Sequence, residues 1–130
     1  MKKIILGRTN QEVSIISLGA WSHGKQNANG GSDVGWANQT DQDSKNALLK
    51  SFSLGLNHWD TADVYGEGHS EKIIGSMWDE ISRKEIFLAT KVGWDKGPNK
   101  NWYDPDYMSS KMHQSLKNLK TDCIDLVYLH

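Results

Sequence analysis

The sequence predicts an α/β fold in which a parallel sheet is covered by helices. Short and nearly continuous apolar runs are typical of buried strands, and they alternate with segments whose apolar residues recur at helical spacing. Strands that are apolar on both faces favour a parallel sheet, because helices cover such sheets on both sides. The length of 130 residues allows one domain of ordinary size.

The first third of the chain predicts paired strands followed by a long loop. The runs Lys3–Leu6 and Val13–Ile16 flank a turn-rich connector, which is typical of a hairpin. The segment Ile15–Trp21 is predicted to continue as a buried strand. The segment Ser22–Thr40 is rich in Gly, Asn, Ser and Asp and has no apolar period, so we expect a long loop there.

Helices and strands alternate in the rest of the chain. Strands are expected at Leu56–Asp60, Ile86–Lys91 and Cys123–His130. Helices are expected at Asp41–Leu54, from the N-cap Ser70 through Ile81, and from the N-cap Asp104 with Pro105 to about Lys120.

Composition and charge exclude several classes of partner. The formal net charge of −1 and the absence of a Lys/Arg cluster argue against nucleic acid and membrane surfaces as partners. No apolar run approaches the ~18 residues of a membrane span. A single cysteine, Cys123, excludes an internal disulfide, fits a cytoplasmic location and is expected to be a packed thiol. The histidines do not share metal-ligand spacing, so no metal site is predicted.

The expected strands end in residues with useful chemistry. Asp60, Lys91 and His130 end three successive strands, and the carboxyl ends of parallel strands form one rim. Tyr65 lies on the loop after the strand that ends in Asp60, so it can lean into the same space. Taken singly, each residue has an ordinary structural alternative, such as a loop cap or a solvated strand end. The prediction of a site rests on their combination.

These residue types together form a proton-donating set. A phenol has a reference pKa of roughly 10 and donates its proton poorly at neutral pH. A nearby ammonium group stabilises the phenolate, and a carboxylate supplies the counter-charge that a partly buried ammonium needs. An imidazole can hydrogen-bond a substrate oxygen. The set predicts protonation of an oxygen while another group attacks its carbon, and a hydride carrier would complete the reaction.

Three stretches of the sequence resemble the N-terminal half of the aldo-keto reductase family. They are LNHWDTADVYGEGHSEKIIG (56–75), IFLATKVGW (86–94) and SLKNLKTDCIDLVYLH (115–130), and the likeness begins at LGRTNQEVSIISLGAW (6–21). The resemblance implies a (β/α)8 TIM barrel preceded by a hairpin that closes its bottom. Residues 1–130 would then be the N-terminal half of one barrel domain, with the hairpin and about four parallel strands. The implied activity is NADPH-dependent reduction of a small aldehyde or ketone to an alcohol.

The resemblance also implies a role for each residue of the rim. Tyr65 would be the general acid, Lys91 and Asp60 would tune it, and His130 would orient the carbonyl.

Cofactor and substrate contacts follow from the same resemblance. Gly19, Ala20, Trp21 and Asp60 are expected to contact the cofactor near its nicotinamide. The substrate-binding residues are expected to be Trp21, Trp94 and His130. For Trp94, packing at the rim is an alternative of nearly equal weight.

The length of the chain departs from the family. A complete barrel takes ~250 residues, whereas this sequence has 130. Strands five to eight and most of the groups that hold the adenosine and phosphates would lie in the missing half. We therefore expect a truncated barrel with weak or no activity by itself and with exposed strand edges, which a second copy of the chain could in principle close. The alternative function is a non-catalytic half-barrel, or a regulatory, partner-binding relative similar to the channel-associated subunits that share this fold.

Overall fold

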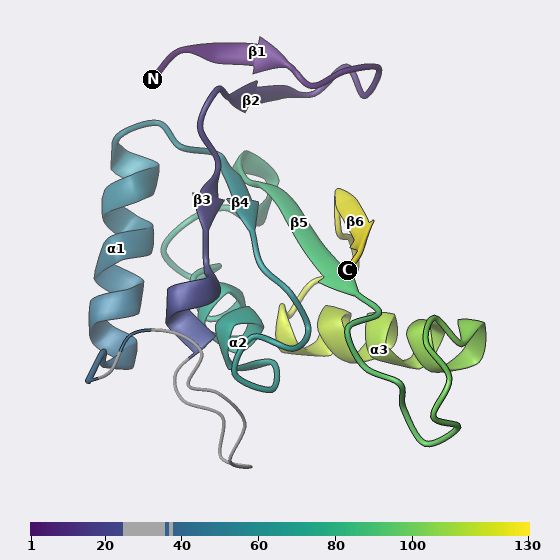
Figure 1. Cartoon of the computed structure of the whole chain (residues 1–130). Helices are drawn as coiled ribbons and strands as arrows, with labels where there is room; N and C mark the ends of the chain where they lie inside the picture. Colours follow the sequence, from purple (N-terminus) through teal and green to yellow (C-terminus); the bar gives the residue numbers. More distant parts are fainter. Residues whose placement is uncertain (25–35, 37) are drawn as a thin grey trace.

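A computed structural model describes residues 1–24, 36 and 38–130. Most of the predicted loop 22–40 therefore lies outside the described residues. The N-terminal hairpin pairs β1 (Lys3–Ile5) with β2 (Glu12–Ser14) in antiparallel fashion. A separate sheet has the order β3 (Leu18–Gly19), β4 (His58–Asp60), β5 (Phe87–Val92) and β6 (Leu126–Leu129), and all of its pairs are parallel (Figure 1). The predicted hairpin and parallel sheet are confirmed.

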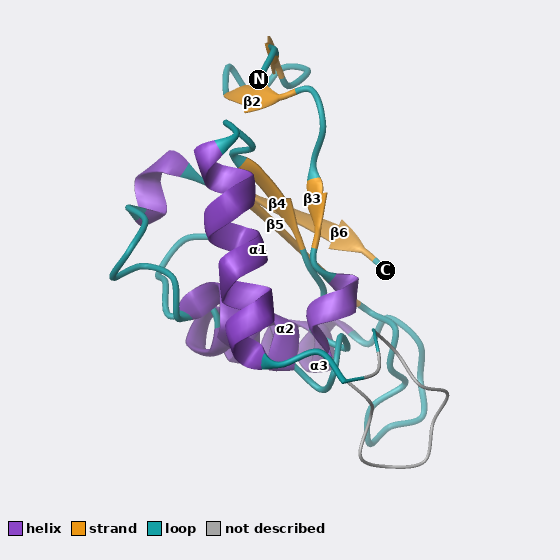
Figure 2. Ribbon diagram, turned by 90° about the vertical axis from the view of Figure 1, so that its left-hand side faces the viewer, coloured by secondary structure: helices purple, strands orange, loops and turns teal. Residues whose placement is uncertain are grey.

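Helices connect the strands of the sheet and lie together on one side of it (Figures 1 and 2). They are α1 (Asp41–Ser53), α2 (His69–Gly75) and α3 (Pro105–Asn118), with short 3-10 helices η1 (Trp21–Gly24) and η2 (Arg83–Glu85). A capping box of Thr40 and Asp43 begins α1. The predicted start of α3 is confirmed, because Asp104 accepts a hydrogen bond from the Tyr107 amide at 2.9 Å.

The core lies between the helices and the sheet. Trp59 of β4 and Leu88 of β5 are fully buried against apolar side chains of the helices. Burying an apolar side chain of this size contributes about 1.5–3 kcal/mol. Trp59 stacks on Trp78 with ring centroids 6.2 Å apart. Within the described part of the chain, no helix has the length and apolarity needed to cross a membrane.

The second helix is shorter than predicted. Gly68, not Ser70, precedes its first turn, and α2 ends at Gly75 rather than near Ile81. Ser70 instead lies inside the helix and donates its hydroxyl to the Ala20 carbonyl at 2.7 Å. Trp78 lies beyond the end of the helix, and its indole N–H donates to the Leu119 carbonyl at 2.6 Å. The residues after Gly75 still bury apolar side chains, so their spacing looked helical in the sequence.

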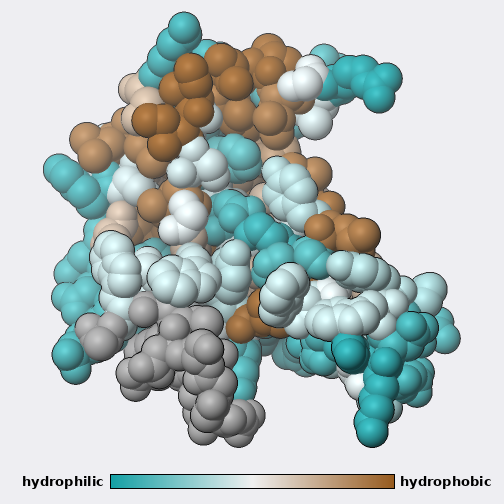
Figure 3. All heavy atoms as spheres, in the orientation of Figure 1, coloured by the Kyte–Doolittle hydropathy of each residue, from teal (hydrophilic) through white to brown (hydrophobic). Residues whose placement is uncertain are grey.

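Two strand predictions are also wrong in extent or burial. Only Leu18–Gly19 of the segment 15–21 pairs with β4, and Ile15 and Ile16 before it are exposed. The last strand is not buried, since Leu129 is 64% exposed. Among the described residues no strand lies beyond β6, so its outer edge and one face are open. Figure 3 shows hydrophobic surface over the hairpin and beside β6.

The hairpin is fixed at the amino ends of the parallel strands. The Asn57 side chain, just before β4, accepts a hydrogen bond from the Ser14 amide at 2.7 Å and donates to the Glu12 carbonyl at 3.0 Å. The carboxyl ends of β4, β5 and β6 therefore lie at the opposite end of the sheet from the hairpin. This is the end that carries the predicted site.

Candidate active site

The ends of neighbouring strands bring three of the predicted residues into one hydrogen-bonded group. Asp60 ends β4, Lys91 is near the end of β5, and Tyr65 is on the loop that follows β4. The Lys91 ammonium donates to Asp60 Oδ2 at 2.6 Å, to the Thr61 carbonyl at 2.8 Å and to Tyr65 Oη at 3.3 Å. The side chains of Lys91 and Asp60 are only partly exposed, so water screens this pair less than a surface ion pair.

His130 stands beside this group, and within the described part of the chain its buried Nδ1 has no hydrogen-bond partner. Its backbone amide donates to the Val92 carbonyl at 2.9 Å and so continues the pairing of β6 with β5. The imidazole meets the Tyr65 ring edge to face, with centroids 5.9 Å apart. Burial and the positive charge of Lys91 lower the pKa of His130, while Asp63 and Asp60 act in the opposite direction. The lowered pKa favours the neutral ring, which can donate one N–H to a bound oxygen.

Two glycines hold the loop that carries Tyr65. Gly66 has a φ of +60°, and a Cβ atom there would overlap the Gly24 carbonyl of η1. A side chain on Gly24 would also be too close, since a Cβ atom there would lie 2.8 Å from the Gly66 nitrogen. The backbones of η1 and of the Tyr65 loop can approach this closely only because neither residue has a side chain.

A pocket of about 510 Å³ opens on this rim. It is lined by Ser17, Gly19, His58, Asp60, Lys91, Tyr128, Leu129 and His130. A Cβ atom on Gly19 would have no described atom within 4 Å, so the space above this residue is open. The sequence reasoning missed His58 and Tyr128. Period-two spacing could have found both, since each lies two residues before a predicted site residue and so on the same strand face.

The other residues predicted to contact the cofactor or the substrate do not line this pocket. Ala20 is fully buried, and its amide donates to the Asp60 carbonyl at 2.8 Å. Trp21, 43% exposed, is in η1 and is not among the residues that line the pocket. Trp94 is 62% exposed, and its ring centroid lies 5.5 Å from that of His130. Trp94 is thus the tryptophan next to the candidate site.

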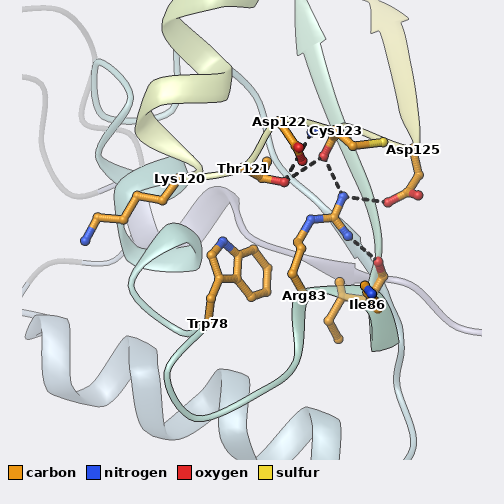
Figure 4. Close-up of a pocket in the computed structure, with 9 residues that line it drawn as sticks. Trp78, Arg83, Ile86, Lys120, Thr121, Asp122, Cys123 and Asp125 are labelled. Atoms are coloured by element: carbon orange, nitrogen blue, oxygen red, sulfur yellow. Dashed lines mark hydrogen bonds and ion pairs between the residues drawn. The ribbon is translucent and has the colours of Figure 1, made fainter.

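A larger hollow of about 810 Å³ lies elsewhere, near the amino ends of β5 and β6 (Figure 4). Arg83, which lines this hollow, already makes hydrogen bonds within the protein. Its guanidinium donates to the Ile86 carbonyl, the Cys123 carbonyl and Asp125 Oδ2 at 2.6 to 2.8 Å. These bonds tie η2 to the segment before β6, which is a structural role. Cys123 is exposed, so the predicted packed thiol is wrong.

A buried carboxyl group that the sequence did not single out lies behind β5. Glu71 of α2 is fully buried and accepts hydrogen bonds from Thr90 Oγ1 and Asn118 Nδ2, each at 2.9 Å. Burial raises the pKa of Glu71 above its ordinary value of 4.5, and these hydrogen bonds oppose the rise. Residues 1–24, 36 and 38–130 contain no group of three or more side chains that could hold a metal ion.

Glu71→Gln is expected to change how stability depends on pH. Because the pKa of Glu71 is raised in the folded chain, the stability due to its proton is fully present below the ordinary value of 4.5 and is lost as pH rises through the folded pKa. The unmodified chain should therefore lose stability relative to the variant as pH increases above 4.5. Urea unfolding of both proteins from acid to neutral pH measures this difference. A difference that stays constant with pH would contradict it.

The fold and the site together define a class: a half-barrel of parallel strands with a hydrogen-bonded group of lysine, aspartate and tyrosine at their carboxyl ends. The chain belongs to the Aldo/keto reductase family, whose model matches residues 15–130. It is 43% identical over 88 residues to the NADP(+) aldo-keto reductase yakc of Schizosaccharomyces pombe, covering 64% of this chain and 26% of that protein. It is 33% identical over 129 residues to a probable voltage-gated potassium channel subunit beta of Oryza sativa, covering 96% of this chain and 36% of that protein.

Solved structures show the same fold. An aldo-keto reductase from Bacillus halodurans, in its holo form, superposes with a TM-score of 0.77 and 32% identity, over 100% of this chain and 40% of that one. The chain thus spans less than half the length of each of these relatives. The structure is that of the hairpin and the first half of the barrel.

Proposed function

We propose that the protein, in a form that closes the barrel, catalyses the NADPH-dependent reduction of an aldehyde or ketone to an alcohol. The observation that carries the proposal is the hydrogen-bonded group that Lys91 makes with Asp60 and Tyr65. Membership of the family supports oxidoreductase chemistry, and the name of the yakc relative supports NADP as the cofactor. Residues 1–130 as the N-terminal half of one barrel domain, and a cytoplasmic location, belong to the same proposal.

Each residue of the group has a distinct role in this reaction. Tyr65 gives its hydroxyl proton to the carbonyl oxygen of the substrate. Lys91 stabilises the phenolate that remains, and Asp60 holds the ammonium group in place. His130, with a neutral ring, donates an N–H to the same carbonyl oxygen and orients it.

The residues at the rim fit the nicotinamide end of NADPH. The pocket of about 510 Å³ is open above Gly19, where a flat ring has room against the backbone of β3. When bound, NADPH supplies the hydride that is added to the carbonyl carbon. Ala20 would act by fixing β3 beside Asp60 through its backbone bond. Contacts of Trp21 with the cofactor, and of Trp21 and Trp94 with the substrate, stay predictions.

Tyr65→Phe is expected to lower kcat for aldehyde reduction by about 10²–10⁴-fold, because the proton donor is removed. The affinity for NADPH, followed by the change in its fluorescence, should be nearly unchanged. Turnover is measured on a form of the protein in which the barrel is complete. NADPH binding is measured on that form and also on the 130-residue chain. Unchanged NADPH turnover with a reactive aldehyde would overturn the proposed role of Tyr65.

The similarity to a channel subunit favours one alternative, a partner-binding protein without turnover. This alternative predicts a stable complex with another protein and no NADPH oxidation with any aldehyde. Intact-mass measurement of the complex and the same turnover assay separate the two functions.

A further inference from the structure

A buried ion pair lies behind the candidate site. Asp63, on the loop between β4 and Tyr65, has a side chain that is only 3% exposed, and its Oδ2 lies 3.3 Å from the ammonium of Lys111 on α3. Besides Lys111, the backbone amide of Val64 also favours the ionised form of this carboxylate. A buried carboxylate held by one cation is weak as a source of stability, because its desolvation offsets the attraction. A gain in stability therefore does not by itself explain why Asp63 is buried beside Lys111.

The pair is connected to the site through the end of β5. The Asp63 amide donates to the Lys91 carbonyl at 3.1 Å, and the His130 amide donates to the next carbonyl, that of Val92, at 2.9 Å. Trp94 links the two sides, since it packs against the His130 ring and also lines a cavity of about 340 Å³ together with Asp63 and Lys111. Asp63 is thus connected to the strand ends that carry His130, although it does not line the pocket of about 510 Å³.

We propose that Asp63 and Lys111 are a positioning pair for the candidate site, in which Lys111 keeps Asp63 ionised and Asp63 supplies negative charge that offsets Lys91 at His130. The proposal rests on the proposed function only for what the charge does during catalysis. His130 is faced by Lys91 of β5, by Asp60 of β4 and by Asp63.

The positive charges around Asp63 favour its ionised form, as the proposal requires. Lys111 of α3 and His130 favour its ionised form, whereas Glu71 of α2 and Asp63 repel each other when both are charged. Burial raises the pKa of Asp63, and Lys111 is the first group that lowers it again. Loss of Lys111 would therefore raise the pKa of Asp63 further and favour its neutral form, and loss of Asp63 would leave Lys91 opposed by Asp60 alone.

The test is an NMR titration of the His130 ring in the 130-residue chain. Of the five histidine signals, the one lost in His130→Gln belongs to this residue. Asp63→Asn is expected to lower the midpoint of His130 by about 0.5–1 pH unit, because an opposite charge that favours the imidazolium is removed. Asp63→Glu, which keeps the charge, should restore most of the shift. Asp122→Asn, the same change at an exposed position near the other end of the sheet, should leave the midpoint unchanged.

An unchanged midpoint in a folded Asp63→Asn chain would overturn the proposal. If that variant does not fold, the unmodified chain gives a second measurement, the ¹³C shift of Asp63 Cγ against pH. Coupled groups each show an inflection at the midpoint of the other. We expect the Cγ shift to inflect at the His130 midpoint and to lose this inflection in His130→Gln, and its absence in the unmodified chain would overturn the proposal. Both measurements are independent of turnover, so a failure of the reductase proposal would leave their result readable.

Discussion

Lys91→Met is expected to lower kcat for carbonyl reduction by about 10²–10⁴-fold while the chain stays folded. Methionine has a similar length but no charge, so the variant loses the donor that binds Asp60 Oδ2, the Thr61 carbonyl and Tyr65 Oη. Without the ammonium, the phenolate of Tyr65 is less stable and the proton is given up less readily.

Steady-state kinetics and NADPH binding together measure this effect. The loss should appear in kcat, with a much smaller change in the dissociation constant of NADPH, because Lys91 acts on the proton donor. Lys84→Met is a matched control in η2 at the amino end of β5, outside the candidate site, and should keep the original kcat. A kcat within twofold of the original in Lys91→Met would show that Tyr65 donates its proton without help from this ammonium.

The candidate site could be predicted from the sequence because each of its members lies at or just after the end of a strand. The ends of neighbouring parallel strands must lie together, so placing Asp60 and Lys91 on adjacent strands already made them neighbours. The apolar runs located those two strands accurately enough to place Asp60 and Lys91 at their carboxyl ends. The assignment of His130 depended most on the family resemblance, whereas the spacing of Tyr65 from Asp60 already placed the tyrosine on a loop beside the same rim.

The errors share a physical cause, which is that periodicity reports burial and not backbone conformation. Met77 and Ile81 are buried as a helical face would be, but α2 has already ended at Gly75. The opposite error occurs at β6, whose apolar residues predicted a buried strand with a paired strand along each edge. Val127 and Leu129 are exposed because, among the described residues, the sheet ends there.

The buried acids behind the site could not be predicted from the sequence. Glu71 and Asp63 are of a residue type that is almost always exposed, so their positions suggested surface. Their partners Asn118 and Lys111 come from α3, far along the chain, and only the packing of α3 against α2 and β5 makes burial possible.

Gly66→Ala is expected to have the largest effect on stability, a loss of about 2–4 kcal/mol in the free energy of unfolding. Two terms contribute. Alanine at a φ of +60° is strained, and its Cβ atom would overlap the Gly24 carbonyl, which belongs to the backbone and cannot rotate away. Urea unfolding, monitored by tryptophan fluorescence, measures the loss.

Gly7→Ala separates these two terms. Gly7 also has a positive φ, of +51°, but a Cβ atom there would meet no described atom within 4 Å. Its replacement should therefore show the backbone strain alone, about 1–2 kcal/mol, and the excess loss in Gly66→Ala would measure the close contact between η1 and the loop that carries Tyr65. Equal losses in the two variants would mean that this loop can move away from η1 at little cost. In that case the position of Tyr65 would depend on its bond with Lys91 rather than on the packing of the two glycines.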